Sequence, residues 1–308
     1  MKRLLFIYNL HSGKGLIRNH LADIIDTFNK AGYETVVYST QERADATRLA
    51  KELGASYDLV VCSGGDGTLS EVLDGVMTID EKRRPKIGYI PAGSTNDYAY
   101  SLGLPSQMKR CANVIAEEKF RAVDVGKFQE NSYFVYVAAF GAFTEVSYAT
   151  PQHLKNLLGH QAYVLEGVKS LAALKPYKVK VTSNELQVED SFVYGMVSNT
   201  ESVGGMRGLA GTGVDLQDGL FEVTLIKEIK NPMEVQQLVT AFLSKNFEKC
   251  DVLYSFKTSK ITFESEEAIK WTLDGEYGGE WKEMRLEVEP RAIEFIIKKR
   301  KEKTKKLN

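Results

Sequence analysis

The hydrophobic positions of the first 120 residues fall into short apolar runs that alternate with helical stretches. The apolar runs cover 4–8, 34–38, 59–62 and 87–90, and the amphipathic stretches cover 17–31, 43–53 and 68–77. Short strands alternating with amphipathic helices predict βαβ units on a parallel sheet. We therefore expect a doubly wound α/β domain over residues 1–123.

The pattern changes after residue 120, where apolar and polar positions alternate with a period of two. Runs of this kind cover 178–181, 192–197, 221–226, 260–263 and 285–288, with helical stretches at 153–174 and 232–243. This alternation predicts a mainly antiparallel β domain over residues 124–290. We expect the remaining segment, 291–308, to return to the first domain and to end in a basic tail.

Charge is nearly balanced over the whole chain but unevenly distributed. The chain has 308 residues with 40 Lys and Arg against 41 Asp and Glu, a net charge of −1 that excludes a generic nucleic-acid binder. Residues 298–308 contain seven basic residues and one acidic residue, which leaves the other 297 residues at −7. Such a basic end is either a solvated tail or a surface for anionic lipid.

The cysteine pattern and the apolar runs narrow the class of protein further. Three cysteines without CxxC spacing predict neither a disulfide framework nor a zinc site, so we expect a reduced, cytoplasmic location. The longest apolar stretch, 133–143, is shorter than the ~20 residues that span a bilayer. We read the N-terminal apolar run as a first strand and not as a signal peptide.

Glycines surround a carboxylate where the apolar run 59–62 passes into the next helix. The junction reads Ser63-Gly64-Gly65-Asp66-Gly67-Thr68. Glycines allow a ligand to approach closely, and free N–H groups at a helix start favour an anion such as phosphate. Because a carboxylate would repel phosphate, Asp66 indicates a cation between the two, with Mg²⁺ the usual one. The alternative is a tight turn in which Asp66 caps the helix.

Two further loops follow apolar runs and contain small or hydroxyl residues. Residues 9–15 include Ser12, Gly13 and a lysine but lack the Walker A spacing. Residues 91–97 offer hydroxyls and an amide that suit the phosphates and sugar of a nucleotide. Each loop alone is equally compatible with a plain turn or a helix cap. Ligands of open α/β sheets bind outside the carboxyl ends of the strands, where all three loops are predicted to lie.

Taken together, the loops resemble those of the bacterial diacylglycerol kinase and sphingosine kinase-like family of lipid kinases, and the resemblance covers nearly the whole chain. The motifs that carry it are Asn9 to Gly13, Gly64 to Thr68 with Glu71, Gly93 to Asp97, Val123 to Gly126, Asp218-Gly219 and Asp274-Gly275-Glu276. The resemblance implies an α/β nucleotide domain, a C-terminal antiparallel β-sandwich domain, and an active site in the cleft between them. It also implies ATP and Mg²⁺ as cofactors and a membrane lipid as the acceptor.

The resemblance also implies roles for individual residues. By position, the nucleotide contacts are Asn9, Ser12, Gly13, Thr40, Gly64, Gly65, Asp66, Gly67, Thr68, Leu69, Ser70, Glu71 and Ser94. Asp66, Asp97 and Asp124 are implied to be the acidic groups that serve the nucleotide and its Mg²⁺. Glu276 is implied to be the general base that takes the proton of the lipid hydroxyl.

Two Asp-Gly pairs of the second domain are turn signals in their own right. Asp274-Gly275 predicts a hairpin turn, and without the resemblance Glu276 would be an ordinary carboxylate at a strand end. The second pair, Asp218-Gly219, is equally compatible with a plain turn and with a cation site. The resemblance implies a structural Mg²⁺ there, held by the Asp218 side chain and the carbonyls of Asp215 and Leu220.

The chain departs from the family pattern at four positions. These are Leu10 in place of proline, Ser70 in place of asparagine, Ser94 in place of threonine and Tyr100 in place of an arginine. The changes at Leu10 and Ser94 are mild, because the loop shape or a hydroxyl is kept. The fourth removes a charge contact and leaves the choice of substrate open.

The leading hypothesis is an ATP- and Mg²⁺-dependent lipid kinase, with diacylglycerol as the acceptor. Its rivals are a kinase of a soluble acceptor, similar to NAD kinase or phosphofructokinase, and a regulator that binds nucleotide or lipid without catalysis. For the first hypothesis we expect a cytoplasmic protein that contacts the membrane surface transiently during catalysis. A homodimer is one option for its assembly, and no nucleic-acid partner is expected.

Overall fold

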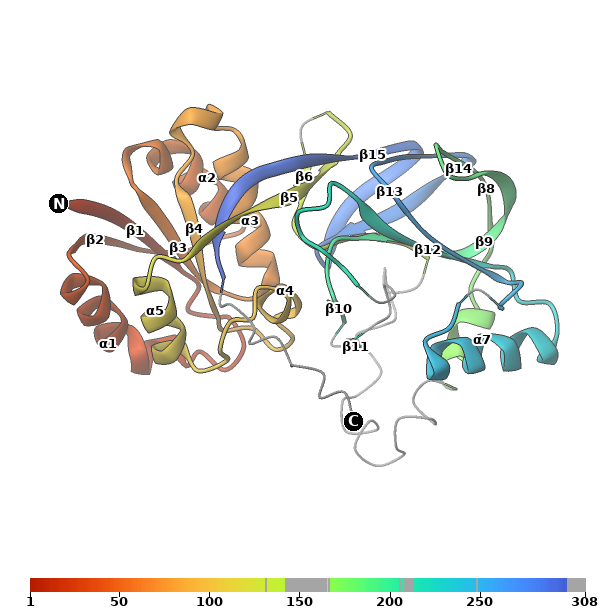
Figure 1. The fold of residues 1–308 in the computed structure, drawn as a ribbon, viewed down its shortest axis with the longest axis horizontal. Helices are drawn as coiled ribbons and strands as arrows, with labels where there is room; N and C mark the ends of the chain where they lie inside the picture. The colour runs from red at the N-terminus through yellow and green to blue at the C-terminus, as the bar shows by residue number, and fades with distance from the viewer. Residues whose placement is uncertain are drawn as a thin grey trace, which may run out of the picture. The chain divides into compact units, whose positions relative to one another are not determined.

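The computed structural model describes residues 1–130, 132–141, 165, 167–204, 206–207, 213–247 and 249–297. These residues form two compact units (Figure 1). Unit 1 comprises Met1–Val123 together with the last described residues, 293–297, and unit 2 comprises Asp124–Ala292. Two strands, β5 (Phe120–Phe128) and β15 (Glu276–Ile296), each contribute residues to both units.

Unit 1 is built on the predicted parallel sheet. Its strand order is β4-β3-β1-β2. At the end of β15, Phe295 pairs in parallel with Ile87 of β4. The bounds are β1 (Lys2–Tyr8), β2 (Tyr33–Ser39), β3 (Leu59–Gly64) and β4 (Lys86–Pro91). Every residue of β3 is buried, as expected for a central parallel strand that is covered on both faces.

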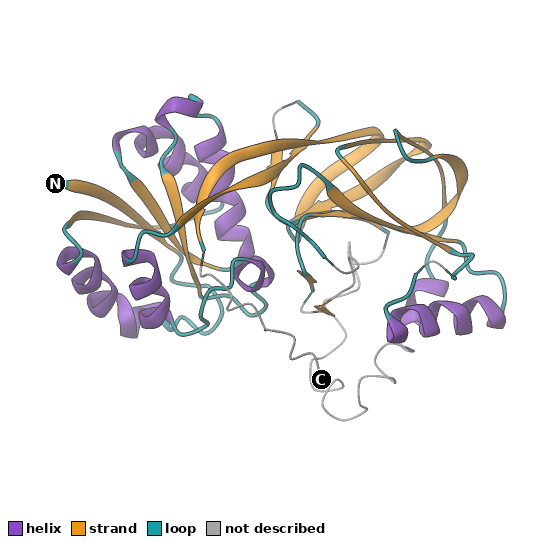
Figure 2. Ribbon diagram, in the orientation of Figure 1, coloured by secondary structure: helices purple, strands orange, loops and turns teal. Residues whose placement is uncertain are grey.

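Helices cover both faces of this sheet (Figure 2). One pair is α1 (Ile17–Lys30) with α5 (Met108–Ala116), and the other is α2 (Asp45–Leu53) with α3 (Asp66–Met77). Two short 3₁₀ segments, Gly54–Ser56 and Glu81–Arg83, and the five-residue helix α4 (Asp97–Ser101) complete the unit. The predicted doubly wound α/β arrangement is confirmed.

Unit 2 is the predicted antiparallel β unit, and each of the five alternating runs lies within a strand. Its further strands are β6 (Ser132–Phe134), β7 (Val137–Phe140), β8 (Tyr177–Ser183), β9 (Gln187–Ser198), β12 (Phe221–Lys227), β13 (Leu253–Thr258) and β14 (Lys260–Leu273), with the short pair β10 (Ser202–Val203) and β11 (Met206–Arg207). The predicted helix at 232–243 is α7 (Pro232–Ser244). Of the helix predicted at 153–174, residues 153–164 and 166 lie outside the described residues.

Two long strands, β9 and β14, hold unit 2 together because each pairs with both β7 and β8 along its length. Large aromatic side chains lie against glycines of the neighbouring strands. Phe134 pairs across the ladder with Gly126, and Phe140 pairs with Gly195. A Cβ at either glycine would lie within 2.2 Å of the opposite ring, so these positions exclude any side chain.

No helix among the described residues is both long enough and apolar enough to cross a membrane.

Close packing of α2 on α3 depends on Gly75. A Cβ there would lie 2.4 Å from the carbonyl oxygen of Thr47 and 2.7 Å from the Cβ of Ala50. We expect Gly75→Ala to lower the free energy of unfolding by about 1–3 kcal/mol in urea denaturation, because overpacking forces the helices apart. Gly167→Ala is the control, since that helical glycine has no described atom within 4 Å of a Cβ. Equal stability of the two variants would contradict the expectation.

Candidate nucleotide and phosphate site

Three loops follow neighbouring strands of unit 1 and emerge at the same edge of its sheet (Figure 1). They are residues 9–15 after β1, 65–68 after β3 and 92–97 after β4. These strands pair in parallel up to their last residues, so their carboxyl ends meet. Unit 1 therefore brings together the three loops that the sequence analysis singled out.

The loops after β3 and β4 touch through their backbones. The N–H groups of Ala92 and Gly93 donate to the carbonyl oxygen of Gly64, at 2.7 and 3.2 Å. A Cβ at Gly93 would lie 2.6 Å from the Cα of Gly65. Glycine at position 93 is therefore required for this contact, and it leaves main-chain atoms exposed where side chains would otherwise stand.

The loop after β1 closes against both of the others. The Ser12 hydroxyl accepts a hydrogen bond from the N–H of Gly65 at 3.2 Å. Gly13 has a φ of +56°, and a Cβ there would lie 2.3 Å from the carbonyl oxygen of Ala92. Both the backbone conformation and the close contact thus require glycine at position 13.

Asn9 and Thr40, two of the implied nucleotide contacts, are also held by the main chain at this edge. The N–H of Asn9 donates to the carbonyl of Ser63, and the N–H of Thr40 donates to the carbonyl of Tyr8, both at 2.9 Å. The side-chain amide of Asn9 lies 3.5 Å from the hydroxyl of Thr68. These contacts fix the ends of β1 and β2 relative to the start of α3.

Asp66 is the first residue of α3, but its carboxylate serves the neighbouring helix α4. Its Oδ2 accepts from the N–H of Asp97 at 3.0 Å, and its Oδ1 accepts from the N–H of Tyr98 at 3.4 Å. The Tyr89 hydroxyl lies 3.4 Å from the same Oδ1. Asp66 therefore does act at a helix start, as the alternative in the sequence analysis allowed, although the helix is α4 and not its own.

The third loop is folded by Asn96, which the sequence analysis included only as a member of that loop. Asn96 has a φ of +54°, and its side chain bonds to both the N–H and the carbonyl of Gly93, at 2.9 and 2.8 Å. The Tyr89 hydroxyl donates to its Oδ1 at 3.2 Å. These hydrogen bonds close the loop and leave Ser94 exposed at its tip.

The run from Gly64 to Glu71 divides into exposed and buried positions. Gly65, Asp66 and Gly67 are half-buried and lie at the surface of the loops. The Leu69 side chain is fully buried, and its N–H donates to the carbonyl oxygen of Gly65. Thr68 and Ser70 are also buried, and the Thr68 side chain packs on Gly64. The implied nucleotide contacts in this run are therefore most accessible at its first half.

Glu71, implied to contact the nucleotide, is engaged at the start of α2. Its Oε1 accepts from the N–H of Ala44 at 3.0 Å, and its Oε2 accepts from the N–H of Ala46 at 3.3 Å. Ala44 has a φ of +66°, which L-residues seldom adopt. The Glu71 carboxylate stabilises this turn and thereby the segment that contains Thr40.

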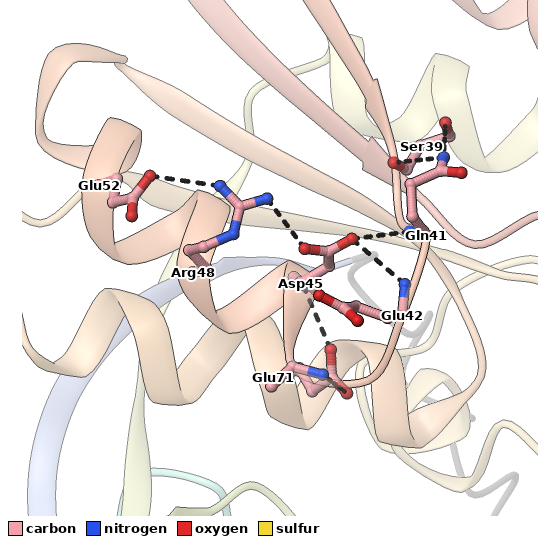
Figure 3. A network of polar contacts seen from close by, with 9 residues as sticks. Ser39, Gln41, Glu42, Asp45, Arg48, Glu52 and Glu71 are labelled. Carbon is pink, nitrogen blue, oxygen red and sulfur yellow. Dashed lines mark hydrogen bonds and ion pairs between the residues drawn. The ribbon is translucent and has the colours of Figure 1, made fainter.

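A second carboxylate, Asp45, reinforces the same turn (Figure 3). Its Oδ2 accepts from the N–H groups of Gln41 and Glu42, at 2.8 and 3.3 Å. Its Oδ1 accepts from the Arg48 guanidinium at 2.9 Å, and Arg48 also reaches Glu52. The bond from Gln41 and the pairing with Arg48 lower the pKa of Asp45.

In unit 2, the implied catalytic acid Asp124 is buried and joins three segments of the unit. Its Oδ2 accepts from the N–H of Gly219 at 2.7 Å, and its Oδ1 accepts from the N–H of Arg291 at 2.8 Å. Its carbonyl accepts from the Asn199 side chain at 3.1 Å. Both carboxylate oxygens thus hold the backbone of unit 2.

The predicted Asp-Gly hairpin turn is present between β14 and β15, with φ values of +50° at Asp274 and +85° at Gly275. The Asp274 side chain is buried and does more than form the turn. Its carboxylate accepts from three consecutive N–H groups, those of Val135, Tyr136 and Val137, at 2.7, 2.9 and 3.0 Å. The sequence analysis missed this clamp, because alternation along a strand does not reveal which distant amides a carboxylate meets.

Glu276, implied to be the general base, is the first residue of β15 and directly follows this turn. Its side chain is exposed. The clamp at Asp274 fixes the backbone from which Glu276 projects, so the direction of Glu276 depends on a residue two positions earlier.

The residues implied to hold a structural Mg²⁺ lie in one turn of unit 2. The N–H of Gln217 donates to Asp215 Oδ1 at 3.2 Å, and the N–H of Leu220 donates to Asp218 Oδ1 at 3.1 Å. The other oxygen of Asp218 accepts from the Lys257 ammonium at 2.8 Å. Lys257 was not singled out from the sequence. Among the described residues, no group of three or more His, Cys, Asp and Glu side chains is placed to hold a metal ion.

Models of two protein families match the chain. Residues 3–128 match the diacylglycerol kinase catalytic domain, and residues 137–297 match the YegS C-terminal NAD kinase beta sandwich-like domain. The two matches cover unit 1 and most of unit 2, and they agree with the fold of each.

Relatives of known name and structure cover nearly the whole chain. A diacylglycerol kinase of Bacillus subtilis is 34% identical over 281 residues, 91% of each chain. A diacylglycerol kinase of Staphylococcus epidermidis is 35% identical over 280 residues, which is 90% of this chain and 87% of the relative. A solved structure from Bacillus anthracis, described as a diacylglycerol kinase, has a TM-score of 0.81 at 27% identity and covers 96% of this chain and 95% of its own.

The lowered pKa of Asp45 gives a prediction for stability. Because the folded pKa lies below the unfolded value of 3.8, the contribution of Asp45 is present above that value and is lost as the pH falls through the folded pKa. We expect Asp45→Asn to unfold at a lower temperature than wild type above about pH 5, with the difference shrinking below pH 3.8. Glu52→Gln, at the exposed end of the network, should have little effect at either pH. A constant difference across this range would contradict the assignment.

Proposed function

Because the chain belongs to the diacylglycerol kinase family, we propose that it transfers the γ-phosphate of ATP, with Mg²⁺, to the hydroxyl of a membrane lipid, and that the lipid is diacylglycerol. The observation that carries this proposal is the contact of three glycine-containing loops around one fixed carboxylate in unit 1. The names of the relatives support the choice of acceptor.

The nucleotide binds at the three loops. Phosphate oxygens accept hydrogen bonds from main-chain N–H groups and small hydroxyls, and the loops carry such hydroxyls at Ser12 and at the exposed Ser94. No bulky side chain stands at Gly13, Gly65 or Gly93 to keep phosphate away from the backbone. A polyphosphate can therefore approach the backbone of the loops closely at these glycines.

Asp66 is the residue of unit 1 best suited to hold Mg²⁺. Its two oxygens accept bonds from Asp97 and Tyr98, which fixes their direction, and carboxylate oxygens are ligands that Mg²⁺ prefers. Bound Mg²⁺ would neutralise charge on the transferred phosphoryl group. The protein's contribution is a carboxylate that needs no rearrangement to meet the ion.

Unit 2 supplies the group that activates the acceptor. Glu276 takes the proton of the lipid hydroxyl as that oxygen attacks the γ-phosphate, and the phosphate leaves ADP as the new bond forms. Asp274 does not touch the substrate in this scheme. It sets the position of Glu276 by holding the turn before it against the amides of Val135 to Val137.

The second candidate function is phosphorylation of a soluble acceptor. It is favoured by the description of the family model that matches residues 137–297, which refers to an NAD kinase beta sandwich-like domain. A non-catalytic regulator is the third. ATP consumption in the presence of diacylglycerol micelles, of NAD, or of neither separates the three, because only the first function makes consumption depend on the lipid.

A lipid acceptor requires contact with a bilayer surface. We propose that this contact is transient and that the basic segment 298–308, which lies outside the described residues, contributes attraction of about 1 kcal/mol per basic residue near anionic lipid. The cytoplasmic location and the homodimer remain predictions.

Removal of either acidic group should abolish transfer. We expect Glu276→Gln to lower kcat by about 10²–10⁴-fold, because proton removal from the hydroxyl is lost. We expect Asp66→Asn to lower it by about 10²-fold or more, because the cation loses its ligand. Glu280→Gln, at an exposed position of the same strand as Glu276, is the control. Thermal unfolding shows whether each variant is folded. Normal turnover by both acidic-site variants would contradict the proposed mechanism.

The clamp at Asp274 has its own test. Asp274→Asn places an amide NH₂ where three N–H groups need an acceptor, so the turn shifts and Glu276 with it. We expect kcat to fall by about 10–100-fold while the KM for ATP stays unchanged. A variant that is less stable but retains full kcat per folded molecule would show that Asp274 has only a structural role.

A further inference from the structure

A lysine side chain places a positive charge in the turn at residues 213–222 of unit 2. Lys257, in β13, extends its ammonium group into the turn. The ammonium donates to Asp218 Oδ2 at 2.8 Å and to the carbonyl oxygen of Gly213 at 3.2 Å, and it lies 3.0 Å from Glu222 Oε1. Two of the three N–H donors of the ammonium group thus have acceptors in the turn, and the positive charge lies beside the Glu222 carboxylate.

This arrangement conflicts with a divalent metal ion in the same turn. Asp218 is the one side-chain ligand that the resemblance implies for Mg²⁺, and its Oδ2 is bonded to Lys257 while its Oδ1 accepts from the N–H of Leu220. An ion bound to this carboxylate would lie within a few ångströms of the ammonium, and the two positive charges would repel each other. The donor set therefore fits a lysine and does not fit Mg²⁺ while Lys257 is in place.

The buried carboxylate of Glu222 makes the ammonium necessary. Glu222 is 4% exposed, and neither of its carboxylate oxygens has a hydrogen-bond partner among the described residues, although the Lys257 ammonium lies 3.0 Å from Oε1 as an ion pair. Asp218 adds a second negative charge to the same place. Without a cation, two carboxylates would face each other with one of them buried.

We propose that the Lys257 ammonium is the cation of this turn in the present chain and takes the place of the structural Mg²⁺ that the resemblance implies. The proposal does not rest on the proposed function, since it concerns the stability of unit 2. It does bear on one implied catalytic residue. The N–H of Gly219, next to Asp218, donates to Asp124 Oδ2 at 2.7 Å. Lys257 is thus a positioning residue for Asp124, acting through the turn.

The test is thermal unfolding of the full chain in EDTA and in Mg²⁺ or Ca²⁺ up to about 10 mM, well above the millimolar Kd of weak protein sites. We expect wild type and Asp218→Asn to respond equally to the ions, because Asp218 holds no metal. Lys257→Met should unfold about 5 °C or more below wild type in EDTA, because it leaves a buried carboxylate unpaired. It should also gain a saturable rise in Tm with Ca²⁺ or Mg²⁺ that the double variant with Asp218→Asn lacks.

Two further measurements keep the proposal falsifiable when Lys257→Met does not fold. Lys257→Arg retains the charge and should keep a Tm that is independent of the ions. In wild type, hydrogen exchange at the Gly219 N–H should be equally slow in EDTA and in Mg²⁺. A saturable Mg²⁺-dependent rise in the Tm of wild type that Asp218→Asn abolishes, or slow exchange at Gly219 only with Mg²⁺, would overturn the proposal.

Discussion

The candidate site depends on a constraint of backbone packing: the turns after β3 and β4 touch where neither has a side chain. Gly93 lies against Gly65 so closely that a methyl group would not fit, and Gly13 meets the carbonyl of Ala92 in the same way. Three strands of a parallel sheet therefore place main chain without side chains at one edge. A ligand can approach the backbone closely there, and the positions of the loops are set by the sheet and not by flexible side chains.

Several parts of the molecule are held in place by carboxylates that accept hydrogen bonds from main-chain amides far away in the sequence. Asp66 holds the start of α4, Glu71 holds the start of α2, and Asp274 holds the segment before β7. Asp124 does the same in unit 2, where it accepts from the N–H groups of Gly219 and Arg291. A carboxylate that accepts several N–H bonds is both satisfied and immobile, so the groups proposed for chemistry are positioned by the same contacts that stabilise each unit.

The periodicity of the sequence was sufficient to predict most elements, because buried strands and amphipathic helices are defined by local spacing. The runs 59–62 and 221–226 lie within strands, and 232–243 lies within α7. Clustered loops were also predictable, since parallel strands place their carboxyl ends together. The Asp-Gly signal correctly predicted the turn at Asp274.

The partners of the buried carboxylates could not be predicted in this way, because they are far away in the sequence. Asp124 meets the N–H of Arg291, 167 positions later, and Asp274 meets Val135, 139 positions earlier. Nothing in a local pattern indicates such a pair. The same holds for Lys257 and Asp218, 39 positions apart, where family resemblance implied a metal ion and the fold brings a lysine.

The central claim is that the loops of unit 1 hold ATP for transfer to a lipid hydroxyl. Its most direct test is transfer from ATP labelled in the γ-phosphate to a panel of diacylglycerol, monoacylglycerol, phosphatidylglycerol, sphingosine, undecaprenol and NAD, with the products separated and counted. The mechanism predicts label in the phosphorylated lipid, with diacylglycerol the best acceptor, and none in NAD. Label in NAD with every lipid unlabelled would contradict it and would make the soluble-acceptor kinase the correct assignment.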